Sequence, residues 1–164
     1  MNNKQIYNIL PLNIPLYTVK ITSKDNKSYI WDILRRKHVI LTPEEWVRQQ
    51  FVHYLVHEKG YPVSLMNNEI SLSLNNTCKR CDTVIYNRDL TPLVIVEYKA
   101  PHITIKQQVF DQITRYNIVM QVPYLIVSNG LKHYCCKVDY SNKSYCFLRE
   151  IPRYDEVTLT NMAK

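Results

Sequence analysis

The chain has 164 residues, 46% of them hydrophobic, and a formal net charge of +7 at pH 7. These values suit one globular domain with a buried core and exclude a disordered chain or a large multidomain protein. No apolar run approaches the roughly 18 residues of a membrane span, and the first residues lack a signal-peptide pattern, so we expect a cytoplasmic protein. Five cysteines, an odd number, favour reduced thiols over a disulfide framework. The excess of lysine and arginine favours an anionic partner.

The N-terminal quarter of the chain predicts strands followed by a helix. Short segments rich in β-branched and aromatic residues, up to about residue 41, predict a meander of strands. A helix then begins after Thr42, which is the expected N-cap, with Pro43 at the first helical position and Glu45 completing a capping box. Gly60 lies just beyond the end of this helix.

An acidic residue precedes the apolar stripe of this helix. Val47, Phe51 and Leu55 repeat at helical spacing and form the stripe expected to face the core. Glu44 lies one turn before that stripe. An acid in the first turn is favoured by the helix dipole, so Glu44 has either this local role or a functional one.

The stretch DTVIYNRDLTPLVIVEYK predicts a β-hairpin with a polar turn. With the turn centred between Asp89 and Leu90, Asp82 falls opposite Glu97, and opposed residues have Cβ atoms about 5 Å apart. Glu97 and Lys99 share one sheet face by the two-residue alternation. A divalent cation between the two carboxylates would turn their repulsion into coordination, and such oxygen ligands suit Mg²⁺. The alternative is an acid–lysine surface pair at a strand end.

The stretch TIKQQVFDQITRYNIVMQ predicts a second helix, with Thr104 and Gln107 as its capping box. Gln112 and Tyr116 are spaced i, i+4 and fall on one side of it. A helix between two strands is a crossover, so the strands on either side of it should be parallel neighbours. The SNG turn and two further strands extend the sheet in antiparallel fashion. Together these elements predict an α/β sandwich with a mixed sheet.

These blocks resemble a known family. Asp82, Glu97-x-Lys99 at a strand end and Gln112-x-x-x-Tyr116 on the following helix resemble the PD-(D/E)XK nuclease fold. The segments LTPEEWVRQ, KRCD, VEYKAP, DQITRYN and YLIVSNG are similar, in order and spacing, to the N-terminal nuclease domain of type I restriction enzyme R subunits (HsdR). The resemblance implies a restriction-endonuclease-like α/β fold, a mixed β-sheet flanked by helices, here preceded by the β meander.

The resemblance covers about residues 28–140, most of the chain. We expect one domain over residues 1–164. Its expected parts are the N-terminal strands at 1–41, a nuclease-like core at 42–140, and a C-terminal strand and tail at 141–164.

The resemblance implies a metal-dependent DNA endonuclease. Asp82 and Glu97 would bind Mg²⁺ or Mn²⁺, helped by the main-chain carbonyl of Tyr98. Glu44 would supply a further carboxylate, directly or through water. Phosphodiester hydrolysis needs a metal-activated water and positive charge near the phosphate, and an acid–lysine cluster at a strand end provides both.

The resemblance also implies roles for residues around the metal. Lys99 would orient or help deprotonate the attacking water and stabilise negative charge on the phosphate. Gln112 and Tyr116 would position the DNA strand or the lysine. The candidate contacts to DNA phosphates, or alternatively plain surface cations, are Arg48, Lys79 and Arg80.

The sequence departs from the family in two respects. Cys81 stands where a small residue is usual, and Tyr98 where a cysteine is common, but neither side chain is an assigned ligand. No GxxxxGK[ST] loop occurs, so the motor of the R subunit is absent from this sequence. A restriction role therefore requires partner subunits. The alternative is a catalytically inactive nucleic-acid-binding or assembly module with the same fold.

A zinc site is a further alternative, because Cys78-x-x-Cys81 has the spacing of a zinc-binding pair. A structural zinc site takes four ligands, usually from two such pairs, and the sequence has one. We expect the cysteines of the later strands to pack in the core.

Overall fold

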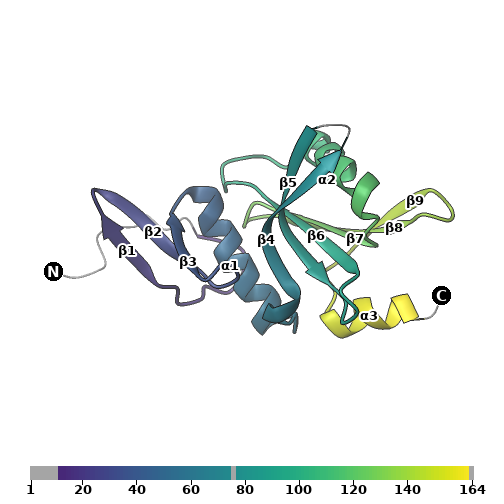
Figure 1. Cartoon of the computed structure of the whole chain (residues 1–164), viewed down its shortest axis with the longest axis horizontal. Coiled ribbons are helices and arrows are strands. Elements are labelled where there is room, and N and C mark those ends of the chain that lie inside the picture. Colours follow the sequence, from purple (N-terminus) through teal and green to yellow (C-terminus); the bar gives the residue numbers. More distant parts are fainter. Residues whose placement is uncertain (1–10, 75–76, 163–164) are drawn as a thin grey trace.

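The structure is a computed structural model and describes residues 11–74 and 77–162. These residues form two β-sheets and three α-helices along an elongated molecule (Figure 1). None of the described helices is long and apolar enough to cross a membrane. The strands are β1 (Ile21–Lys24), β2 (Lys27–Asp32), β3 (Lys37–Ile40), β4 (Met66–Leu74), β5 (Thr77–Tyr86), β6 (Pro92–Tyr98), β7 (Tyr124–Ser128), β8 (His133–Asp139) and β9 (Ser144–Leu148). The helices are α1 (Pro43–His57), α2 (Gln107–Met120), α3 (Tyr154–Met162) and a short 3₁₀ turn, η2 (Val63–Leu65).

The N-terminal strands form a small antiparallel sheet in the order β1-β2-β3, which confirms the predicted meander. This sheet lies at one end of the molecule, on the far side of α1 from the large sheet (Figure 1). Its first strand begins later than the apolar stretch from Ile14 suggests. The reason is that the chain there runs along α1, where the Gln50 amide accepts from the Tyr17 backbone N–H at 2.8 Å and donates to its carbonyl at 3.0 Å. The Gln50 side chain thus pairs with this segment as a neighbouring strand would.

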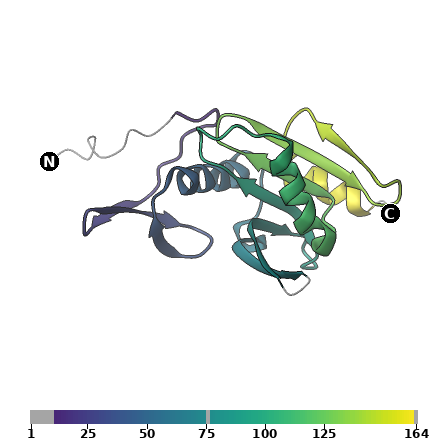
Figure 2. The same ribbon diagram turned by 90° about the horizontal axis from the view of Figure 1, so that it is seen from above.

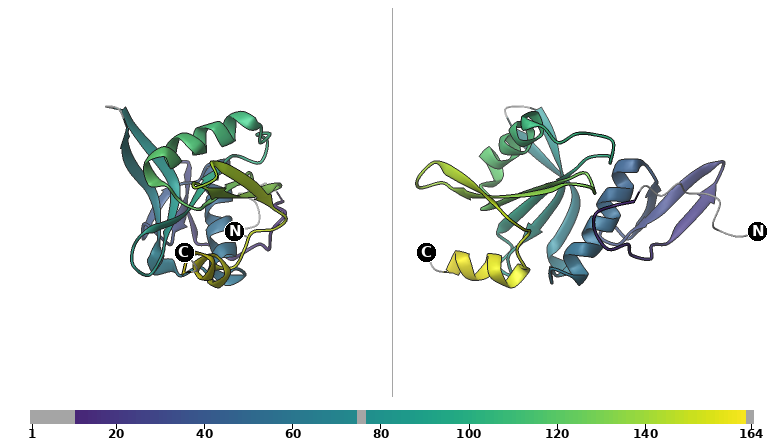
Figure 3. Two further views of the ribbon diagram at one scale, coloured as in Figure 1. Left: turned by 90° about the vertical axis from the view of Figure 1, so that its right-hand side faces the viewer. Right: turned by 180° about the vertical axis from the view of Figure 1, so that it is seen from behind.

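The large sheet of the described residues has the order β4-β5-β6-β7-β8-β9. β6 and β7 are parallel and the other neighbours are antiparallel, which confirms the mixed sheet. Helix α2 makes the predicted crossover and covers one face, while α1 and α3 lie on the opposite face (Figures 2 and 3).

The central strand β6 is buried on both sides, because the sheet has helices on both faces. Val94 and Val96 pack in the core that includes Phe51 of α1. Ile95, between them, packs in the second core with Ile113 of α2. A strand covered on both faces is apolar at every position, which explains the uninterrupted run LVIV.

Helix α1 begins as predicted. The Thr42 hydroxyl accepts a hydrogen bond from the Glu45 backbone N–H at 3.0 Å, and the predicted inward stripe is fully buried. The Glu45 carboxylate does not complete a capping box. It instead accepts from the Gln49 amide at 2.8 Å and binds two arginines, Arg35 and Arg48.

Two expectations about the other helices are wrong. Helix α2 begins at Gln107 with Lys106 at the N-cap, so Thr104 lies outside the helix and forms no capping box with Gln107. The C-terminal segment contains β9, as expected, but also helix α3. Tyr154 and Val157 of α3 are buried in the same core as α1, and this long-range packing holds a short helix that has little propensity of its own.

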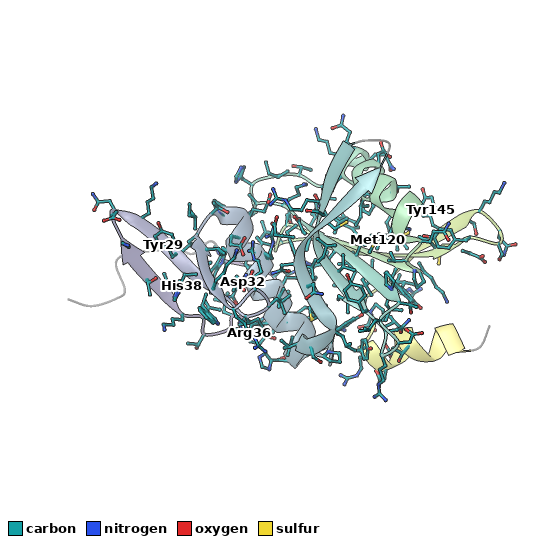
Figure 4. The ribbon with its side chains drawn as sticks, in the orientation of Figure 1. Tyr29, Asp32, Arg36, His38, Met120 and Tyr145 are labelled. Atoms are coloured by element: carbon teal, nitrogen blue, oxygen red, sulfur yellow. The ribbon has the colours of Figure 1, made fainter. Side chains whose placement is uncertain are left out.

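A buried aspartate ties the small sheet to the large one. Asp32, at the end of β2, is 0% exposed and accepts hydrogen bonds from the Leu34 and Arg35 backbone N–H groups at 2.8 and 3.0 Å (Figure 4). It also accepts from the Arg35 side chain and, at 2.9 Å, from Asn68 of β4. Burial alone would raise the pKa of Asp32, but the hydrogen bonds from Arg35 and Asn68 outweigh it, so the pKa is lowered.

We expect Asp32→Asn to destabilise the protein by about 3 kcal/mol, because it removes a buried charge from Arg35 and presents an amide donor to the Asn68 donor. Urea unfolding followed by circular dichroism would measure this loss. Asp25→Asn, in the exposed turn between β1 and β2, is the matched control and should change stability by less than about 0.5 kcal/mol. Equal effects of the two changes would contradict the structural role of Asp32.

Candidate functional site

The predicted hairpin register is confirmed in the structure. Thr83 of β5 pairs with Val96 of β6, and the next two pairs toward the turn follow the same register. One further step away from the turn places Asp82 opposite Glu97. The two carboxylates therefore come from neighbouring strands of the large sheet.

A third acid, Glu69, lies beside Asp82, so Glu69, Asp82 and Glu97 form an acid row across three neighbouring strands. Asn68 of β4 pairs with Thr83, so the next residue, Glu69, lies opposite Asp82 on the other side of β5. Glu69 has a φ of 60°, which interrupts the regular strand at this point. The sequence analysis did not include Glu69 in the site. Applying the hairpin-register argument used for β5 and β6 to β4 and β5 would have identified Glu69.

The predicted acids and lysine are held by direct contacts. The Arg48 guanidinium Nη2 donates to Asp82 Oδ1 at 3.0 Å, and the Tyr98 backbone N–H donates to Asp82 Oδ2 at 2.8 Å. Lys99 Nζ donates to Glu97 Oε1 at 2.8 Å. The structure thus brings Asp82, Glu97 and Lys99 together at the end of β6.

Burial and the nearby charges shift the pKa values of the acids and of Lys99. Burial is the largest cause that raises the pKa of Glu97 to about 7; the charges of Asp82 and Glu44 add to it, and Lys99 opposes it. Burial also raises the pKa of Asp82, against the effects of Arg48 and the Tyr98 N–H. The pKa of Lys99 is raised, since its bond to Glu97 outweighs its burial. Lys99 is therefore a cation at neutral pH.

Glu44 belongs to the same electrostatic cluster. Burial raises the pKa of Glu44, and the Asp82 charge raises it further. The first turn of α1 thus brings Glu44 within the field of Asp82 and Lys99. Glu45 forms ion pairs with Arg35 at 3.1 Å and with Arg48 at 3.2 Å, so it shares Arg48 with Asp82.

The three candidate phosphate contacts differ in their surroundings. Arg48 was expected at the surface but is 3% exposed, because it is enclosed by acids: its Nη1 lies 2.5 Å from Glu69 Oε1, and its Nη2 binds Asp82. Arg80 is exposed and its Nε lies 2.9 Å from Glu69 Oε2. The side chain of Lys79 lies outside the described part of the chain. Arg48 is therefore a buried counter-ion rather than a surface cation.

Two further predicted residues lie on α2. Gln112 and Tyr116 are within the helix, which covers the sheet face that carries Ile95 and, by alternation, Glu97. Their side chains lie outside the described part of the structure, so their roles remain predictions.

The cysteine pair gives little support for zinc. Cys81 is fully buried, and burial is the main cause that raises the pKa of its thiol to about 12. This disfavours the thiolate that a zinc site requires. The side chain of Cys78 lies outside the described residues, so the predicted pair remains untested.

A divalent cation needs several oxygen ligands arranged around one point. Within residues 11–74 and 77–162, no three His, Cys, Asp or Glu side chains are arranged to hold a metal ion as they stand. Arg48 and Lys99 instead bind the acids directly. The chemistry of the donors nevertheless suits Mg²⁺, because Asp82 and Glu97 offer hard carboxylate oxygens from neighbouring strands. A cation would have to share or exchange the contacts that these two cations make.

A separate cavity of about 530 Å³ lies between α2 and the β8–β9 hairpin. Its lining is mainly apolar and includes Phe110, Tyr145 and Phe147. Tyr145 lies at the opposite end of the molecule from the small sheet (Figure 4). The described lining residues include none of the acids of the row, so this cavity is distinct from the candidate site.

The fold and the acid–lysine row define a restriction-endonuclease-like α/β domain. A family model described as type I restriction enzyme R protein N terminus (HSDR_N) matches residues 43–152, more than half of the chain. The chain therefore belongs to this family, and the resemblance found in its motifs is confirmed.

A solved structure agrees with this assignment. A fragment described as an HsdR subunit of a type I restriction enzyme from Vibrio vulnificus YJ016 is similar, with a TM-score of 0.57 and 19% sequence identity. The match covers 75% of this chain and 26% of that chain, so this chain spans about a quarter of the fragment. At this identity the likeness shows the shared fold. A comparison with curated proteins gives no match.

We expect the raised pKa of Glu97 to make stability depend on pH. An acid whose pKa rises from 4.5 to about 7 on folding stabilises the protein fully below pH 4.5 and loses this contribution as pH rises through 7. The loss attributable to Glu97 is at most about 3 kcal/mol. Urea unfolding in EDTA at several pH values from 5 to 8.5 should therefore show a shallower decline for Glu97→Gln than for the wild type. Parallel declines would contradict the shift.

Proposed function

We propose that this chain is a Mg²⁺- or Mn²⁺-dependent endodeoxyribonuclease domain that hydrolyses phosphodiester bonds in DNA. The observation that carries the proposal is the position of Asp82 and Glu97 on neighbouring strands with Lys99 bound to Glu97. Membership of the type I restriction enzyme R protein N-terminus family supports a nuclease-type domain.

In this proposal the carboxylates of Asp82 and Glu97 hold the metal ion, with the main-chain carbonyl of Tyr98 and the carboxylate of Glu44 as further ligands. The ion would supply a bound water of lowered pKa and charge stabilisation for the phosphate. Lys99 stays protonated, because the pKa of its ammonium group is raised. Its role is therefore to orient the attacking water by hydrogen bonding and to stabilise charge on the phosphate oxygens.

The substrate and partners belong to the same proposal. Lys79 and Arg80 would contact DNA phosphates, and Gln112 and Tyr116 would position the strand or Lys99. The proposed partners are other restriction-modification subunits in the cytoplasm, because the chain belongs to the family of type I restriction enzyme R protein N termini.

One observation favours a second candidate function, an inactive nucleic-acid-binding or assembly module. Arg48 and Lys99 already bind Asp82 and Glu97, so each of these two carboxylates is paired with a cation without a metal ion. A protein with this function would bind DNA in a salt-sensitive way and leave it intact.

The nuclease proposal is tested by incubating the protein with linear, circular and single-stranded DNA in Mg²⁺, Mn²⁺ or EDTA. We expect cleavage with the metals, and a loss of at least about 100-fold in Asp82→Ala and Lys99→Ala, because each removes a charge that acts on the reacting groups. Asp111→Ala and Lys27→Ala, at exposed positions, are matched controls and should cleave normally. Cleavage that persists in Asp82→Ala, or DNA binding without any cleavage, would overturn the proposal.

A further inference from the structure

Arg48 occupies the centre of the acid cluster. Its Nη1 lies 2.5 Å from Glu69 Oε1 and 3.2 Å from Glu45 Oε2, and its Nη2 lies 3.0 Å from Asp82 Oδ1. The side chain is 4% exposed, so these carboxylates replace the water that a surface arginine would bind. One guanidinium thus serves three acids from three elements, α1, β4 and β5.

The contact with Asp82 conflicts with the binding of a cation. Asp82 Oδ1 accepts from Arg48 and Oδ2 accepts from the Tyr98 N–H, so each oxygen of this carboxylate already has a donor. The Tyr98 bond comes from the sheet backbone and is fixed by the fold. A divalent cation at Asp82 would therefore meet the positive charge of Arg48 at Oδ1, and the two charges repel.

We propose that Arg48 is an internal counter-ion that competes with the divalent cation for Asp82, and that Glu69 is the positioning residue that retains Arg48 when the cation binds. This inference rests on the proposed function, because it concerns the same site. It assigns to Arg48 a role in metal binding in place of a phosphate contact.

The two terminal nitrogens of Arg48 bind different acids, so a cation can replace Arg48 at Asp82 while Arg48 keeps its other partners. Nη2 binds Asp82, whereas Nη1 binds Glu69 and Glu45. When Nη2 leaves Asp82, Nη1 keeps two carboxylates, so no unpaired charge is left buried. Glu69 is itself held in place, because its second oxygen lies 2.9 Å from Arg80 Nε.

The same contacts require an arginine. A planar guanidinium presents several donors in a fixed fork, whereas an ammonium group is a compact point charge. The Arg48 guanidinium also lies over the Tyr98 ring, with Cζ 5.7 Å from the ring centroid. A lysine at this position would keep the charge but would not bridge Asp82 and Glu69.

The competition is tested by calorimetric titration of the full chain with MnCl₂. We expect Arg48→Gln to bind Mn²⁺ about tenfold more tightly than the wild type, because a repelling charge is removed. Arg48→Lys should give a smaller gain and serves as a second variant if Arg48→Gln unfolds. Arg36→Gln is the matched control: it removes one positive charge from the exposed turn between β2 and β3, so Mn²⁺ affinity should change less than twofold.

The positioning role of Glu69 is tested by a double-mutant cycle. Glu69→Gln should weaken Mn²⁺ binding about tenfold in the wild type, because Arg48 then rests more fully on Asp82. In the Arg48→Gln background the same change should weaken binding about twofold or less. A merely structural or ligating role of Glu69 would give equal losses in both backgrounds, which would overturn its assignment.

Asp82→Ala separates this inference from the proposed function. If Asp82→Ala abolishes Mn²⁺ binding while Arg48→Gln and Arg48→Lys bind as the wild type does or more weakly, the role of Arg48 is overturned and the metal site stands. If Asp82→Ala binds Mn²⁺ as the wild type does, or if neither the wild type nor the Arg48 variants bind, both fail. Binding by Arg48→Gln alone would support the inference, since it would mean that Arg48 excludes the cation.

Discussion

The structure depends on the electrostatic balance of a row of acids across three adjacent strands. Glu69, Asp82 and Glu97 occupy successive positions on β4, β5 and β6, where like charges destabilise a sheet and burial adds a further cost. Arg48 and Lys99 offset this cost by direct contact. The sheet can keep these acids side by side because α1 brings a cation to them from outside the sheet.

This requirement accounts for the unusual surroundings of α1. A surface helix normally exposes its polar face, yet Glu45, Arg48, Gln49 and Gln50 of α1 are all buried. The small N-terminal sheet and the segment before it cover this face. They provide partners for it, because Arg35 binds Glu45 and the Tyr17 backbone binds Gln50.

A chain of alternating charges therefore links the two sheets. Asp32 at the end of β2 binds Arg35, Arg35 binds Glu45, Glu45 binds Arg48, and Arg48 binds Asp82. Asn68 closes a second path, since it donates to Asp32 and accepts from Thr83 beside Asp82. The small sheet thus supports the geometry of the acid row, although it contributes no acid to it.

The sequence predicts those features that depend on local pattern. The predicted register holds for the pairs from Ile85 outward and leads to Asp82 opposite Glu97, although the pair next to the turn, Tyr86 with Pro92, is shifted by one residue. The Thr42 cap set the start of α1. The features that it did not predict depend on contacts between distant segments. The burial of Arg48 requires β4 and β5 to meet α1, and α3 is held by the core beneath the sheet.

The acid cluster makes the distribution of charge over the chain uneven. The net charge is +7, although several of its 14 acidic residues gather around Asp82 and Glu97. Five acids of this cluster (Glu44, Glu45, Glu69, Asp82 and Glu97) lie among four cations (Arg35, Arg48, Arg80 and Lys99), so the rest of the chain is slightly more positive than the whole. Under the proposed function, that positive remainder attracts a phosphate backbone, whereas the acid row repels it at the point of reaction. A divalent cation bound at the acid row would remove this repulsion. Because Arg48 would leave Asp82 but stay bound to Glu69 and Glu45, the bound cation would add its positive charge to the site.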